Sequence, residues 1–113
     1  NLVLNGFGEA AAIAGAEREI QAKGVKTLYH GADMSKPDQI EAMVRRCETE
    51  LGSCDILINN AGIQHVAPIE SFPDERWDAV IAINLSSSFH TIKHALPQMW
   101  GARCRCCCCK TGR

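Results

Sequence analysis

Residues 54–62 read Cys-Asp-Ile-Leu-Ile-Asn-Asn-Ala-Gly, and this stretch decides the fold. Cys54 to Ile58 is a nearly continuous apolar run, which is typical of a strand covered on both faces of a parallel sheet. Asn59 to Gly62 follows at once, and two adjacent amides beside a buried strand are costly unless their hydrogen bonds are met. Taken alone, the motif is explained by an Asx turn that closes a strand. The neighbouring segments decide between that turn and a ligand site.

Upstream of this stretch, strand-like and helix-like runs alternate. Residues 1–5 and 25–30 are short apolar runs of strand type, whereas residues 9–23 repeat apolar side chains at helical spacing. Gly24 stands where a glycine commonly ends a helix. The pattern predicts a strand, a helix and a second strand before residue 31.

The helix that precedes Cys54 carries a start and a stop signal. Ser35 is a good N-cap, Pro37 suits the first turn, and Asp38 completes a variant of the capping box. Gly52 is expected to end the helix. The apolar side chains between these signals form one stripe at helical spacing: Ile40, Met43, Val44, Cys47 and Leu51.

A last helix is predicted after a loop at residues 59–72. Ser71 is its expected cap, with Pro73 in the first turn and Asp74 at the capping-box position. Pro97 is expected to end or kink it. The apolar side chains along it are Trp77, Val80, Ile81, Leu85 and Phe89.

The predicted order is strand, helix, strand, helix, strand, helix. Such alternation indicates βαβ units, and hence an α/β fold with part of a Rossmann-like, doubly wound parallel sheet. Ligands bind these sheets outside the carboxyl ends of the strands. Those ends fall at residues 5–7, 31–33 and 59–62, so we expect the functional site there.

Composition excludes several classes of partner. The formal net charge of -1 does not favour binding to nucleic acid or to an anionic membrane. The sequence has no apolar run of about 20 residues that could span a bilayer and no secretory signal pattern. Of seven cysteines, five crowd into residues 104–109, so the body of the chain is cysteine-poor and fits a reducing cytosol.

Two polar residues beyond the Asn-Asn-Ala-Gly motif are candidates for a site. Asp33 ends the second predicted strand, where it could accept a hydrogen bond from a ligand amine or cap the next turn. Asn84 lies on the apolar stripe of the last helix, seven residues after Trp77. An amide in that position must find partners inside the protein, so it is either a structural group or a polar device that holds a water or a catalytic side chain.

Together these features resemble the short-chain dehydrogenase/reductase family. The resemblance rests on a strand followed by Asn59-Asn60-Ala61-Gly62, on Asp33 upstream, and on Trp77-Asp78 followed by Asn84-Leu85, and it covers about residues 1–99. The sequence of residues 58–90, together with the segments NLVLNGFG and HGADMS, most resembles the branch of the family whose members interconvert D-3-hydroxybutyrate and acetoacetate with NAD.

The resemblance implies a role for each site residue. Phe7 would border the adenosine ribose, and no Arg or Lys stands beside it to receive a 2′-phosphate, in agreement with NAD. Asn84 would be the asparagine of the catalytic tetrad and hold a water, and Gln64 would bind the substrate carboxylate or be an ordinary loop amide. The remaining cofactor contacts would be Asp33, Met34, Asn60 and Gly62. No metal ligands are expected, and His65 and His90 are expected to be packing or surface residues.

The resemblance also implies what the chain lacks. The family's first strand with its glycine-rich turn, and its catalytic Ser and Tyr-x-x-x-Lys pair, have no counterpart here, so we expect a partial NAD-binding domain at residues 1–99 that is inactive alone. In the family that first strand lies between the counterparts of residues 1–5 and 54–58. Residues 100–113 depart from the pattern as an atypical Cys-rich tail.

The resemblance implies a cytoplasmic enzyme that is homo-oligomeric when complete and acts on a small hydroxy acid. The alternative is a non-catalytic product that binds intact subunits, or binds soft metal through its tail.

Overall fold

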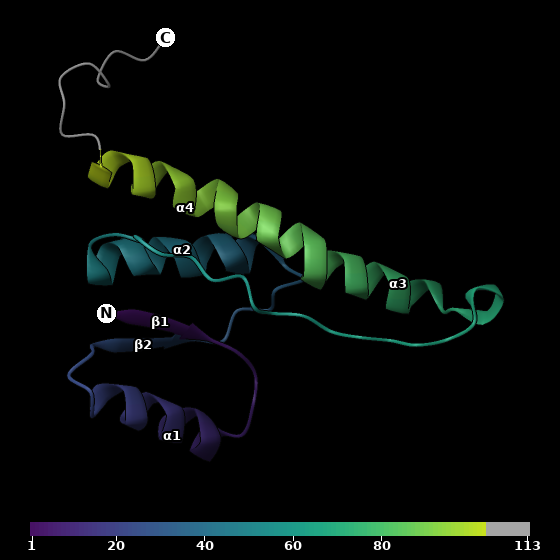
Figure 1. The fold of residues 1–113 in the computed structure, drawn as a ribbon, viewed down its shortest axis with the longest axis horizontal. Helices are drawn as coiled ribbons and strands as arrows, with labels where there is room; N and C mark the ends of the chain where they lie inside the picture. The colour runs from purple at the N-terminus through teal and green to yellow at the C-terminus, as the bar shows by residue number, and fades with distance from the viewer. Residues whose placement is uncertain (104–113) are drawn as a thin grey trace, which may run out of the picture. The chain divides into compact units, whose positions relative to one another are not determined.

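The computed structural model describes residues 1–103, which fall into two compact units, Asn1–Asp33 and the chain from Met34 onward (Figure 1). The predicted Cys-rich tail lies outside the described residues from Cys104 onward. In the part that the structure describes, no helix combines the length and apolar character needed to cross a membrane.

The first unit is a βαβ unit, as predicted. Strand β1 (Leu2–Asn5) leads into helix α1 (Ala10–Gln21), which returns the chain to strand β2 (Thr27–His30). The two strands pair in parallel, in a register that runs from Leu2 opposite Thr27 to Asn5 opposite His30. Because the strands are parallel, their carboxyl ends meet at one edge of the sheet.

Helix α1 covers this sheet with a half-buried apolar stripe. Ile13, Ala16 and Ile20 are spaced three and four residues apart and are less exposed than most of the helix. The helix ends at Gln21 rather than Lys23, and Gly24 then turns the chain towards β2 with a φ of 76°. A positive φ is readily adopted only by glycine. Gly24 therefore makes the turn after the helix, but it lies further beyond the last helical residue than predicted.

The second unit is helical. Helix α2 (Pro37–Leu51) packs on helix α4 (Ser87–Arg103). A 3₁₀ turn η1 (Ile69–Ser71), helix α3 (Asp74–Ile81) and a π-helical turn η2 (Ala82–Ser86) lead into α4, so that α3, η2 and α4 form one continuous rod (Figure 1). The most buried apolar residues of the second unit include Ile40 on α2 and Ala95 on α4, each 0% exposed.

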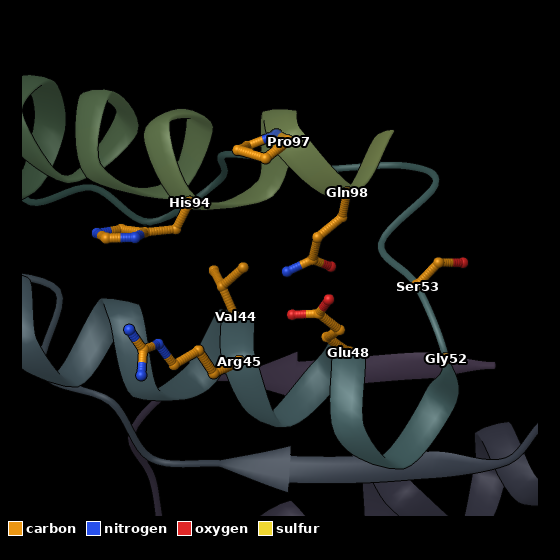
Figure 2. A pocket seen from close by; sticks show the side chains of 8 residues that line it. All are labelled: Val44, Arg45, Glu48, Gly52, Ser53, His94, Pro97 and Gln98. Atoms are coloured by element: carbon orange, nitrogen blue, oxygen red, sulfur yellow. The ribbon is translucent and has the colours of Figure 1, made fainter. Parts of the chain in front are cut away.

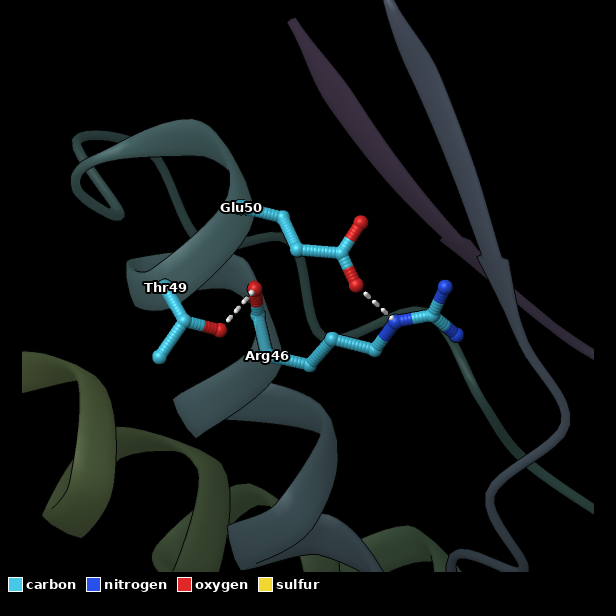
Figure 3. A network of polar contacts seen from close by, with 3 residues as sticks. All are labelled: Arg46, Thr49 and Glu50. Carbon is cyan, nitrogen blue, oxygen red and sulfur yellow. Dashed lines mark hydrogen bonds and ion pairs between the residues drawn. The ribbon is translucent and has the colours of Figure 1, made fainter.

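Helix α2 carries two ion pairs at i,i+4 spacing. Arg45 pairs with Glu41, and the Arg46 Nε donates to Glu50 Oε1 at 2.5 Å (Figure 3). Thr49 Oγ1 donates to the Arg46 carbonyl at 3.2 Å. All four charged side chains are at least one-third exposed, so each pair contributes only about 0.3–0.5 kcal/mol. They support the helix without defining a site.

The predicted serine caps are wrong, and the prolines explain why. The N-cap of α2 is Lys36 and that of α3 is Pro73, and neither makes a side-chain capping bond. A residue before proline is kept out of the helical region, so Lys36 is extended (φ −114°, ψ 106°) and helix α2 cannot begin before Pro37. Ser71 instead ends the 3₁₀ turn η1.

The end signals of the helices gave mixed results. Gly52 caps α2 with a φ of 93°, as predicted. Pro97 was predicted to end or kink the last helix, and it does not end it, because α4 runs on through Trp100 to Arg103. A proline removes the hydrogen bond to the carbonyl four residues earlier. That residue is Lys93, which is exposed, so water can satisfy its carbonyl.

The third predicted strand does not form. Among the described residues the sheet contains only β1 and β2, and Cys54–Ile58 is extended chain without a ladder partner. Ile56 and Ile58 are 82% and 80% exposed, whereas Leu57 between them is half-buried. The exposure of these side chains alternates as in a strand, but no described segment pairs with them. The prediction of a strand at Cys54–Ile58 is therefore wrong for the part of the chain that the structure describes.

Hydrogen exchange measures this difference directly. We expect the amides of Ile56 and Ile58 to exchange at least about tenfold faster than the β2 amides that donate to β1, because those β2 amides are held in the ladder. Slow exchange at Ile56 and Ile58 would contradict the assignment, since it would require a pairing partner for this segment.

Candidate functional site

The centre of the candidate site is a two-point contact between Asn84 and the backbone of Ile63. Asn84 Nδ2 donates to the Ile63 carbonyl at 2.9 Å, and Asn84 Oδ1 accepts from the Ile63 amide at 2.9 Å. The side chain thus imitates a neighbouring strand for one residue. Asn84 was expected to be either a structural group or a polar device that holds a water or a catalytic side chain. The structure gives it a structural partner, which is the backbone of the residue directly after Gly62.

Asn84 is presented by a widened helical turn. Residues 82–86 form the π-helical turn η2, in which the Ser87 amide donates to the Ala82 carbonyl, five residues back. In an α-helix that amide would bond to Ile83, so the widening removes the Ile83 carbonyl's usual donor. The buried Ser87 hydroxyl replaces it at 2.5 Å. Single π turns often occur at functional sites.

A second anchor fixes the first residue of the Asn-Asn-Ala-Gly motif. Thr91 is 1% exposed, and its Oγ1 donates to Asn59 Oδ1 at 2.7 Å. The Ser88 carbonyl lies 3.0 Å from the same oxygen. A hydroxyl has one proton to donate, so the two acceptors share it. Thr91 is two helical turns from Asn84 and faces the same segment.

Thr91 and Asn84 together hold the two ends of a short exposed loop. Asn60, Ala61 and Gly62 lie between the anchored residues Asn59 and Ile63, and all three are exposed. A Cβ added at Gly62 would lie 3.5 Å from Asn84 Oδ1, which is an ordinary contact. Crowding by described residues therefore does not require glycine here.

Gln64 follows this loop and is exposed. The next residue, His65, packs edge-on against Phe72 with ring centroids 5.2 Å apart, and Phe72 in turn meets Trp77 edge-on at 6.4 Å. His65 is therefore a packing residue, as predicted. The aromatic contacts tie the part of the loop after His65 to α3. Gln64 therefore lies between Ile63, which Asn84 holds, and His65, which packs on Phe72.

The first unit holds Phe7 on a loop with its own fixed geometry. Phe7 is 74% exposed and lies beside a hollow of about 250 Å³. Tyr29 donates its hydroxyl to the Gly6 carbonyl at 2.6 Å, which holds the loop against β2. The hollow is lined by residues of β1, the following loop, α1 and β2: Leu4, Asn5, Gly6, Phe7, Gly8, Ala12, Ile13, Ala16 and Tyr29.

Asn5 performs a similar task at the end of the sheet. Its Nδ2 donates both hydrogens, to the His30 carbonyl at 2.8 Å and to the Ala32 carbonyl at 3.0 Å. This fixes the chain just before Asp33, which is half-buried, and Met34, which is 9% exposed. Asp33 therefore follows the carboxyl end of β2 at a defined position.

A separate hollow of about 480 Å³ lies between α2 and α4 (Figure 2). The Gln98 side-chain oxygen is buried there without a hydrogen-bond donor among the described residues. None of the predicted site residues lines this hollow, and it opens at the C-terminal end of α2. It is lined by Val44, Arg45, Glu48, Gly52, Ser53, His94, Pro97 and Gln98. Among the described residues, no group of three or more His, Cys, Asp or Glu side chains could hold a metal ion.

The sequence interpretation missed four residues that shape these sites. Ser87 lies in a run of three serines, and Thr91 follows that run on the same helix. Hydroxyls on a helix often bond to backbone carbonyls, and this was the available signal. Asn5 and Tyr29 gave no signal beyond their place at the strand ends. They were overlooked because they bind backbone rather than a ligand.

Comparison with known proteins places the chain in a family. A family model described as short chain dehydrogenase matches residues 4–105. The chain belongs to the short-chain dehydrogenase family, whose members bind nicotinamide cofactors and share a Rossmann-like fold.

Its similarity to particular members is high over a limited length. It is 57% identical over 105 residues to a D-beta-hydroxybutyrate dehydrogenase of Cupriavidus necator and 49% identical over 106 residues to that of Rhizobium meliloti. Each alignment covers 89% of this chain but only 40% and 41% of the relative. A metagenomic short-chain oxidoreductase solved with NADP matches with a TM-score of 0.80 and 33% identity, over 88% of this chain and 45% of its own.

The Asn84 contact makes a specific prediction. In Asn84→Ala both bonds to Ile63 are lost, which should cost about 1–3 kcal/mol of local stability and raise exchange of the Ile63 amide roughly 10- to 100-fold. Asn60→Ala is the control, because that side chain is exposed. Equal exchange at Ile63 in both variants would mean that the contact does not hold the loop.

Proposed function

We propose that this chain is a cofactor-binding segment of an NAD-dependent oxidoreductase that interconverts D-3-hydroxybutyrate and acetoacetate. The observation that carries the proposal is the Asn84–Ile63 contact, which fixes the end of the Asn-Asn-Ala-Gly loop in a chain whose family binds nicotinamide cofactors. The 57% identity to a D-beta-hydroxybutyrate dehydrogenase supports the substrate. The chain spans about 40% of that relative, so the activity belongs to a complete protein.

Residues at the carboxyl ends of the strands and after residue 59 are proposed to contact the nucleotide in the complete protein. Phe7 would border the adenosine ribose, Asp33 and Met34 would contact the adenine, and Asn60 and Gly62 would line the cleft. When bound, the nicotinamide ring would supply the hydride acceptor or donor. NAD is favoured over NADP because no Arg or Lys adjoins Phe7 to pair with a 2′-phosphate.

The proposed catalytic contribution of this chain is that of Asn84. Its Oδ1 has a second lone pair and its Nδ2 a second hydrogen, and the contact with Ile63 uses one of each. The exposed side chain can therefore hold the loop and still bind a water that passes a proton. Gln64, exposed beside the anchored loop, is proposed to donate to the substrate carboxylate.

The exposed apolar side chains and the distribution of the cysteines support proposals on assembly and location. Apolar side chains along the rod of α3, η2 and α4 are strongly exposed, which supports contact with another subunit in a homo-oligomer. They include Trp77, Leu85, Phe89 and Ile92, which are 54%, 65%, 61% and 47% exposed. The same face supports the alternative function, a non-catalytic chain that binds intact subunits. A cytoplasmic location is proposed from the cysteine-poor body of the chain.

The chain by itself should not catalyse hydride transfer to NAD. Its one tyrosine, Tyr29, lies in β2 and donates to the Gly6 carbonyl, so it cannot serve as the acid or base. We expect no NAD reduction above background when the pure chain is assayed with D-3-hydroxybutyrate, with the Cupriavidus necator enzyme as positive control. Turnover close to that of the control would contradict the proposal.

In a complete enzyme containing this segment, Gln64→Ala should raise KM for D-3-hydroxybutyrate while the Kd for NAD stays within about twofold. Loss of one hydrogen bond to a charged group costs about 1.5–3 kcal/mol, or roughly 10- to 150-fold in KM. The neighbouring Val66→Ala, also at an exposed position, is the control. An unchanged KM would remove Gln64 from the substrate site.

A further inference from the structure

Two cysteines outside the candidate site lie close together at the end of α2. Cys47 is in the last turns of that helix and Cys54 follows the turn at Gly52. Both thiols are free, and both residues are half-buried. The site that holds Asn84 does not use either of them.

The Gly52 turn brings these two side chains together. Gly52 has a φ of 93°, its amide donates to the Glu48 carbonyl at 2.9 Å, and the chain reverses there. Cys47 Sγ consequently lies 3.5 Å from the carbonyl oxygen of Ser53, the residue that precedes Cys54. Each thiol also lies close enough to the other to shift its pKa. Two thiols that a turn holds close together need less movement to form a bond than thiols far apart in the chain.

We propose that Cys47 and Cys54 form a redox-active dithiol that closes to an intramolecular disulfide by exchange with a low-molecular-weight disulfide such as glutathione disulfide. The Cys47 thiolate attacks the small disulfide, forming a mixed disulfide and releasing one glutathione thiolate. The Cys54 thiolate then attacks the Cys47 sulfur and releases the second. The two cysteines lose two electrons and two protons, and two glutathione molecules carry them away.

The order of attack follows from the surroundings of the two thiols. Burial raises the pKa of both above the ordinary value for a cysteine. The influence of Cys54 lowers the pKa of Cys47, whereas the influence of Cys47 raises the pKa of Cys54, which favours Cys47 as the attacking thiolate. Because both pKa values are raised, exchange should be slow at neutral pH and should rise about tenfold per pH unit while the thiols remain mostly protonated.

The bridge would join the end of α2 to the start of the segment that leads to Asn59. Residues 54–58 have no ladder partner among the described strands, so the link would restrain a part of the chain that no sheet holds. The dithiol is therefore a modification site whose oxidation acts on the segment before the anchored loop.

The test uses the full chain with the five cysteines at positions 104 and 106–109 replaced by serine, so that only the pair can react. The chain is equilibrated with reduced and oxidised glutathione, in buffer and in concentrated urea, and alkylated. Trypsin then releases residues 47–76 as one peptide that contains both cysteines, and cleavage after Glu48 and Glu50 separates them. The disulfide appears as a loss of two hydrogens and as two linked peptides after the second digest.

We expect the effective concentration of one thiol for the other to be at least about tenfold higher in buffer than in urea, because the folded turn holds the thiols together. Cys47→Ser and Cys54→Ser in the same background should each yield a stable mixed disulfide with glutathione instead. Equal effective concentrations in buffer and urea, or mixed disulfides on both cysteines of the unsubstituted pair, would overturn the proposal. The readout involves no nicotinamide, so it is independent of the proposed enzymatic function.

Discussion

The arrangement of the candidate site depends on one side chain that takes the place of a strand. Asn84 binds both polar groups of the Ile63 backbone, and the segment that carries Ile63 has no ladder partner among the described residues. The contact is exposed, so water competes for the Ile63 amide and carbonyl, and each bond contributes about 0.5–1.5 kcal/mol over a bond to water. The exposed loop from Asn60 to Gly62 keeps a defined start and end only because Asn84 and Thr91 reach it from the rod of helices.

This constraint explains why the rod contains a widened turn. A regular α-helix from Asp74 to Arg103 would place the residues after Ala82 in a different rotation about the helix axis. The π turn resets that rotation between α3 and α4, and the Ser87 hydroxyl compensates the carbonyl that loses its donor. Side chains also fix the backbone in the first unit. Asn5 and Tyr29 donate to backbone carbonyls there and so fix the chain around Phe7 and Asp33.

The sequence predicted the fold class, the parallel βαβ unit and the end of α2, because these depend on local periodicity and on a glycine with positive φ. It did not predict the caps of α2 and α3, since the effect of Pro37 and Pro73 on the preceding residue outweighs the capping preference of serine. It also predicted a strand at Cys54–Ile58. Strand formation needs a partner as well as a pattern, and a single segment cannot report whether that partner exists. The Asn84 anchor was visible as an amide on an apolar stripe, but its partner was not.

The direct test of this account is a measurement of scalar coupling through the hydrogen bonds of Asn84. In the isotopically labelled chain, the account predicts coupling between the Asn84 side-chain nitrogen and the Ile63 carbonyl carbon, and between the Ile63 amide nitrogen and the Asn84 side-chain carbonyl carbon. Such coupling would also fix which way the amide points, an orientation that hydrogen-bond partners otherwise have to decide. Absence of both couplings, together with an Asn84 side-chain amide that exchanges as fast as a free one, would contradict the claim that Asn84 holds the loop.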